Sequence, residues 1–146
     1  MLDAQNCLTP LAAGQTLVAT GRTTDALDCK VAAPHLGKGE PMVAEIVVTA
    51  IDAASADETY TAQLGHDADP ARGSVTAVGP ILTIPRSITV PKTYTLEIPP
   101  GEALERYLDV GFTLGGTTPS ITVKVHIKPQ RAVQQDAAYP DALTLL

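Results

Sequence analysis

Aromatic residues are scarce in this sequence: they make up 3% of its 146 residues, and tryptophan is absent. The apolar core must therefore be built from valine, isoleucine, leucine and alanine. Basic residues are also few, because 10 lysines and arginines stand against 16 acidic residues and leave a formal charge of −6. A nucleic-acid binder needs a basic surface to neutralise phosphates, so this charge predicts no nucleic-acid partner.

Long apolar segments are missing as well. No run approaches the roughly 18 consecutive apolar residues that a membrane-spanning helix needs, so we predict no membrane partner. The amino-terminal segment carries Asp3 where a secretory signal would carry lysine or arginine, and no apolar stretch of adequate length follows it. We therefore expect a protein that is made in a cytoplasm and is not exported by the general secretory route.

Cysteine is represented only by Cys7 and Cys29. In a reducing compartment the leading interpretation is a pair of reduced, buried thiols. A disulfide that ties down the amino-terminal segment is the alternative. Two lone cysteines without close spacing do not predict a metal site.

The histidines do not form a metal-binding pattern. His35, His66 and His126 are isolated, and no His-x-His pair would put two imidazoles on one face of a strand. His126 alternates with Lys124 and Lys128 on the polar side of a predicted strand, so we expect it to be exposed to solvent.

The carboxylates and glycines do not predict catalysis either. The pairs Asp67/Asp69 and Glu102/Glu105 lie in turn-rich segments, where acidic side chains commonly cap the local backbone. No phosphate-binding loop, nucleophile elbow or metalloprotease motif is present. We therefore predict no catalytic residue, no metal and no cofactor, and an enzyme is the least favoured class.

Proline and glycine, in contrast, are spread along the whole chain, with twelve and eleven residues. This frequency suits short strands joined by tight turns better than long helices. The clearest strands are the runs Thr93–Ile98, Tyr107–Leu114 and Ser120–Lys128. Apolar residues occupy every second position of each run, which is the pattern of half-buried antiparallel strands.

Further strands are predicted before these three, with no helix between them. They lie at Gln15–Thr20, Asp25–Lys30, Pro41–Ile51 and Glu58–Leu64, with two short edge segments in Ser74–Ile84 on either side of Gly79-Pro80. A turn is expected at Gly21-Arg22, and the short segment Ser87–Val90 lies between Pro85 and Pro91. Eight or nine short strands predict an all-β fold, an antiparallel β-sandwich, and about eight predict a jelly roll. An immunoglobulin-type sandwich is disfavoured because the Cys…Trp…Cys pattern is absent.

We divide the chain into an amino-terminal arm (1–14), the jelly-roll sandwich (15–128) and a carboxy-terminal arm (129–146). The run Pro41–Ile51 is apolar on both faces, which indicates a strand that is covered on both sides or takes part in an interface. The carboxy-terminal arm is either frayed or packed on a neighbouring subunit. Candidate interface residues are Val43, Glu45, Val47, Ile51, Tyr139, Leu143, Leu145 and Leu146.

Three segments in order suggest a family. The first two are Met1-Leu2-Asp3-Ala4-Gln5-Asn6 and the approach from Asp28 through Gly37-Lys38-Gly39-Glu40-Pro41 to the long apolar strand. The third and most specific is Ile98-Pro99-Pro100-Gly101, then Arg106-Tyr107-Leu108, an apolar strand, the turn Gly115-Gly116-Thr117-Thr118 and the strand Ile121–Ile127. In their order and spacing, from about Met1 to Lys128, these segments resemble the jelly-roll capsid cement (decoration) proteins of tailed bacteriophages.

The resemblance implies a small jelly roll on the outer capsid surface of a virion. Its implied partners are the major capsid protein and a second copy of itself, as a homodimer at two-fold positions. The implied role is to stabilise the expanded phage head. Two alternatives remain open: a carbohydrate-binding or adhesin sandwich, which the scarcity of aromatic rings disfavours, and a ring-forming head-completion or tail-tube protein.

Overall fold

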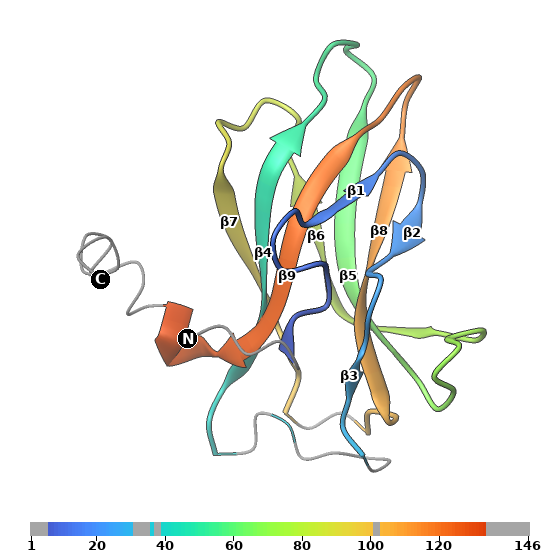
Figure 1. Cartoon of the computed structure of the whole chain (residues 1–146), viewed down its shortest axis with the longest axis vertical. Helices are drawn as coiled ribbons and strands as arrows, with labels where there is room; N and C mark the ends of the chain where they lie inside the picture. The colour runs from blue at the N-terminus through green and yellow to red at the C-terminus, as the bar shows by residue number, and fades with distance from the viewer. Residues whose placement is uncertain (1–5, 31–35, 37–38, 101–102, 134–146) are drawn as a thin grey trace.

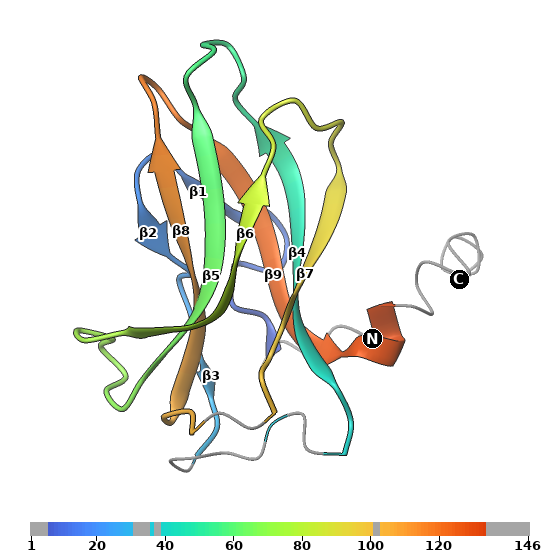
Figure 2. The same cartoon turned by 180° about the vertical axis from the view of Figure 1, so that it is seen from behind.

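The computed structural model describes residues 6–30, 36, 39–100 and 103–133, and these residues form two antiparallel β-sheets packed face to face (Figure 1). Along the first sheet the order is β1 (Gln15–Leu17), β9 (Ile121–Pro129), β4 (Met42–Ile51) and β7 (Lys92–Glu97). Along the second sheet, which faces the viewer in Figure 2, it is β2 (Gly21–Arg22), β8 (Tyr107–Gly115), β5 (Thr59–Asp67) and β6 (Thr76–Ile84), and β3 (Leu27–Asp28) also pairs with β8.

The connections give the jelly-roll topology. β2 and β3 pair with successive parts of β8, so together they take one strand position. The chain then crosses between the sheets at every connection except the β5–β6 hairpin. Eight positions in two four-stranded layers confirm the predicted antiparallel β-sandwich of the jelly-roll type.

The core lies between the two sheets and follows the alternation in the sequence. In β8, Leu108, Val110 and Phe112 point inward and are at most 1% exposed. Ile121 and Val123 of β9 face them from the other sheet and are fully buried. Alternate side chains of a strand point to opposite faces, so these apolar positions form one face and the polar positions form the other.

Two β-bulges make β6 and β4 differ from the strands that we expected. Gly79-Pro80 lies in a bulge within one continuous β6, not between two separate segments, because the register to β5 shifts by the extra residues. In β4 the register shifts between Val48 and Ala50. Ile51 therefore packs against the core instead of sharing the outer face with Val43.

One other local prediction was wrong. Gly21 and Arg22, expected in a turn, pair with β8 as β2. Among the described residues, no helix is long and apolar enough to cross a membrane.

The described part of the amino-terminal arm, from residue 6 onward, lies within the sandwich. Leu8 is fully buried in the core, and its amide donates a hydrogen bond of 2.9 Å to the Val125 carbonyl of β9. The Thr9 hydroxyl accepts a bond of 3.2 Å from the Val125 amide. Residues 7–9 and β1 thus lie one after the other along the same edge of β9.

Candidate functional site

A cluster of two arginines and one aspartate lies on the outer face of the second sheet. Arg22 of β2 donates from Nε and Nη2 to the two carboxylate oxygens of Asp109, at 2.8 and 2.6 Å. Arg72, from the β5–β6 loop, donates from Nη1 to Asp109 Oδ2 at 3.1 Å. The Asp109 side chain is 1% exposed, and two guanidinium groups share its single negative charge. The cluster therefore carries one surplus positive charge.

Arg72 also fixes the loop that carries it. Its Nη1 donates to the Thr23 carbonyl at 2.7 Å, and its Nη2 donates to the Thr24 carbonyl at 2.8 Å. Within the same loop, Asp67 accepts from the amides of Asp69 and Ser74 at 2.9 Å. These backbone bonds hold the pKa of the Asp67 carboxyl below its ordinary value. Asp67 is thus a local cap, as its position in the sequence predicted.

Two strand glycines make room for Arg22. A Cβ atom at Gly111 would lie 2.7 Å from Arg22 Nη1, and one at Gly65 would collide with Nη2. Both glycines lie on the outer face, because Gly65 pairs with Asp109 and Gly111 pairs with Arg22. Glycine inside a strand often marks the close approach of another group, and here that group is a guanidinium held against the sheet.

Beside this guanidinium the outer face is hollowed. The hollow has a volume of ≈ 270 Å³, and its lining is uncharged apart from Arg22. The lining residues are Thr20, Gly21, Arg22, Gln63, Leu64, Ala77, Gly111, Phe112 and Thr113.

The outer face of the first sheet is different, because it carries a row of ionisable side chains. Cys7 forms an isolated antiparallel β-bridge with His126, and His126 is the backbone partner of Glu45 in β4. Directly opposed residues of antiparallel strands share a face, so the three side chains lie side by side. Glu45 also forms an ion pair of 2.7 Å with Lys128.

His126 is buried, at 5% exposure, so the prediction of a solvent-exposed histidine was wrong. Burial lowers the pKa of its imidazole, and Lys128 and Lys124 lower it further, while Glu45 acts in the opposite direction. Neither ring nitrogen has a hydrogen-bond partner in the part of the chain that the structure describes. The thiol of Cys7 donates instead to the Thr9 carbonyl at 2.8 Å.

The fold therefore brings together a cysteine and a histidine that are far apart in the sequence. No sequence signal could have predicted this neighbourhood, because the amino-terminal segment has no periodic pattern. The hydrogen bond from thiol to imidazole that activates a nucleophilic cysteine is absent from these two residues. Both cysteines are free thiols, as the leading interpretation of the sequence had it, but only Cys7 is buried and Cys29 is partly exposed.

The candidate interface residues that the structure describes do not form one exposed surface. Val43 and Glu45 are 2% and 8% exposed, and Val47 is partly buried. Ile51 contacts the core beyond the β4 bulge. Tyr139, Leu143, Leu145 and Leu146 lie outside the described residues.

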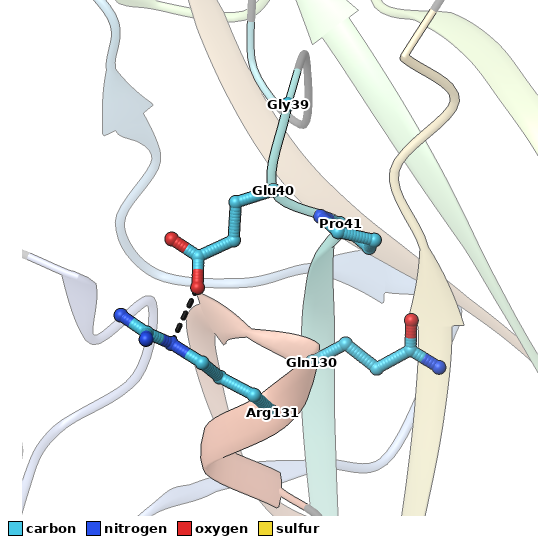
Figure 3. A pocket seen from close by; sticks show the side chains of 5 residues that line it. All are labelled: Gly39, Glu40, Pro41, Gln130 and Arg131. Carbon is cyan, nitrogen blue, oxygen red and sulfur yellow. Dashed lines mark ion pairs between the residues drawn. The ribbon is translucent and has the colours of Figure 1, made fainter.

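A second hollow, of ≈ 480 Å³, lies where the helical turn of residues 130–133 meets the start of β4. Glu40 and Arg131 point toward each other across it and form an ion pair, while Gln130 extends away from that pair (Figure 3). Both charged side chains are exposed, and such surface pairs contribute about 1 kcal/mol or less. The hollow joins two segments but offers no unpaired charge among its described residues.

The segment that carries the most specific resemblance has a structural role. Arg106 donates from Nε and Nη2 to the Asp28 carboxylate at 2.7 and 2.9 Å, and its guanidinium lies 5.1 Å from the centre of the Tyr107 ring. The Arg106 bonds hold the pKa of Asp28 well below its usual range. This pair fastens β3 to β8.

The other histidine and acidic residues singled out in the sequence do not form one site among the described residues. His66 accepts a bond from the Glu105 amide at 3.2 Å, and its Nδ1 lies 3.5 Å from the Glu105 carboxylate. Residues 35 and 102 are not described. No group of three or more potential metal ligands occurs within the described ranges.

Comparison with known proteins adds one finding. No curated protein matches the chain. The model of the Bbp16 family matches residues 11–127, which include every strand described above except the last two residues of β9. Because this match covers most of the sequence, the chain belongs to the Bbp16 family, which is a phage-like, virion-type family.

Proposed function

We propose that this protein is a capsid cement protein, which binds the outer surface of a phage head and stabilises it. The observation that carries the proposal is the family match over residues 11–127, which indicates a phage-like, virion-type protein. The jelly-roll sandwich agrees with the fold that the resemblance to cement proteins implies. The proposed partners are the major capsid protein and a second copy of this chain.

The physics of such a role suits this molecule. A cement protein needs a rigid core and adhesive faces that repeat over a lattice, and the proposal assigns it no catalytic step. Two linked copies would hold on much more tightly than one, because the second contact forms at a high local concentration. A standard interface of about 1,600 Å² per contact is enough for stable attachment.

The test is to add the purified protein to mature heads that lack it. We expect cryo-microscopy to show ordered extra density on the outer surface, and we expect the reconstituted heads to survive higher temperatures than bare heads. An unrelated acidic β-sandwich of similar size serves as the control. If the protein leaves both the density and the thermal stability unchanged, the proposed function is wrong.

A further inference from the structure

We infer that the hollow beside Arg22, on the outer face of the second sheet, receives an acidic side chain of the partner protein. This inference rests on the proposed function, because it takes the partner to be the protein of the shell. It adds the face that binds and the chemistry that the face recognises.

The first argument is an incomplete set of hydrogen bonds. Arg22 uses Nε and Nη2 on Asp109, while Nη1 has no partner among the described residues. The Arg22 side chain is 33% exposed and lines the hollow. A carboxylate that meets a guanidinium edge forms a charge-assisted hydrogen bond, which is stronger than a neutral one.

The second argument is charge. Asp109 offsets only one of the two guanidinium charges that contact it, so the cluster attracts an anion. The Arg22 guanidinium is held rigidly by its two bonds to Asp109 and by the sheet beneath it, so little side-chain entropy is lost when a ligand binds.

The third argument is the composition of the surrounding face. The outward residues of β5 and β8 that line the hollow are uncharged: Gln63, Gly111 and Thr113. Asp109, farther along β8, is already bonded by Arg22 and Arg72. Interface centres are depleted in charged residues other than arginine, and arginine is frequent among the residues that contribute most to binding. The first sheet, in contrast, presents Glu45, Lys124 and Lys128 on its outer side.

A single carboxylate suits this site better than a nucleic-acid phosphate chain. A polyanion requires an extended basic surface, and this protein has a net charge of −6. One guanidinium nitrogen that has no hydrogen-bond partner among the described residues, beside a small hollow, matches the tip of an aspartate or glutamate side chain.

The test introduces a carboxylate beside Arg22 by substituting a residue of this protein. Thr113 is exposed and lies two positions along β8 from Gly111, which pairs with Arg22. A diagonal neighbour at this spacing is within reach of a long side chain. We therefore expect the new carboxylate of Thr113→Glu to accept a hydrogen bond from Arg22 Nη1. Thr113→Gln has the same size without the charge. Thr93→Glu adds the same charge at an exposed threonine of β7, on the other sheet.

Binding of the three variants to heads that lack the protein is measured by co-sedimentation, after thermal denaturation has verified that each is folded. We expect Thr113→Glu to bind about tenfold more weakly than Thr113→Gln, and Thr93→Glu to bind like the wild type.

Equal binding of Thr113→Glu and Thr113→Gln would overturn the inference and leave the proposed function standing, because the wild type still binds. Failure of the wild type to bind would overturn both. If Thr113→Glu changes the oligomeric state but not binding to heads, the acidic group belongs to a second copy, and the inference about the shell protein is wrong.

Discussion

Gly65 and Gly111 leave the space that the Arg22 side chain fills. The effect of filling this space can be measured as a change in the free energy of unfolding. A Cβ atom in Gly65→Ala would collide with Arg22 Nη2 and would lie 2.5 Å from Val75 Cγ1. Because Arg22 is fixed by Asp109, we expect the free energy of unfolding to fall by about 1–3 kcal/mol in urea denaturation. Gly73→Ala is the matched control, since no atom lies within 4 Å of its added Cβ, and it should be nearly neutral. Equal effects would show that Arg22 moves aside freely.

His126 should make stability depend on pH. Its pKa is lowered in the folded protein by burial, while an unfolded histidine titrates near 6.5. The unfolded state therefore binds the proton more readily. The stabilisation is complete above about pH 6.5 and is lost as the pH falls toward the lowered pKa, with a slope of at most about 1.4 kcal/mol per pH unit.

Urea denaturation between pH 7.5 and 5 measures this effect. The other groups that titrate in this range are common to both proteins, so the difference between the wild type and His126→Gln isolates the imidazole. We expect the variant to have the shallower pH dependence. Parallel curves would mean that protonated His126 is accommodated next to Glu45.

These two residues illustrate what sequence reasoning reaches at this scale. The alternation correctly put His126 on the same side as Lys124 and Lys128. It could not reveal that this side is covered there, because alternation gives the face and not what packs against it. The Arg22–Asp109 pair was beyond reach, since pairing of β2 with β8 joins segments that no local pattern connects.

Among the structural elements, the segment of residues 7–9 lies in the sandwich as firmly as a strand does. Leu8 is fully buried in the core, while Leu11 is 48% exposed. We expect Leu8→Ala to cost about 2–5 kcal/mol of unfolding free energy and Leu11→Ala to cost less than about 0.5. Thermal and urea denaturation of both variants measure the difference. A mild effect at Leu8 would mean that the segment detaches without disturbing the core.

Strands with strict alternation were predicted well, and irregular elements were not. The runs Thr93–Ile98, Tyr107–Leu114 and Ser120–Lys128 correspond to β7, β8 and β9 within about one residue at either end. The segment around Leu8 has no period, because only a few of its residues pair before the chain turns away. Bulges were also hidden: a single extra residue in β4 reversed the side on which Ile51 packs.

At the scale of the whole molecule, the proposed role predicts a particular assembly. Native mass spectrometry should give two copies of the 15.2 kDa chain, in agreement with a dimer at two-fold positions. Rings of six or twelve copies would favour a head-completion or tail-tube protein instead. Thr113→Gln should leave the number of copies unchanged, because the hollow beside Arg22 is proposed to face the shell and not the second copy.

The arrangement around β9 also governs when the chain can fold during synthesis. β9 is flanked by β4 on one side and by β1 with residues 7–9 on the other, and the Thr16 hydroxyl meets that of Thr122, 106 residues later. The first sheet therefore lacks one of its two central strands until β9 has emerged from the ribosome. We therefore expect folding to be late, with the millisecond-to-second rates of all-β domains rich in distant contacts. Nascent chains that stall before β9 emerges should expose β1 and β4 to chaperones and proteases.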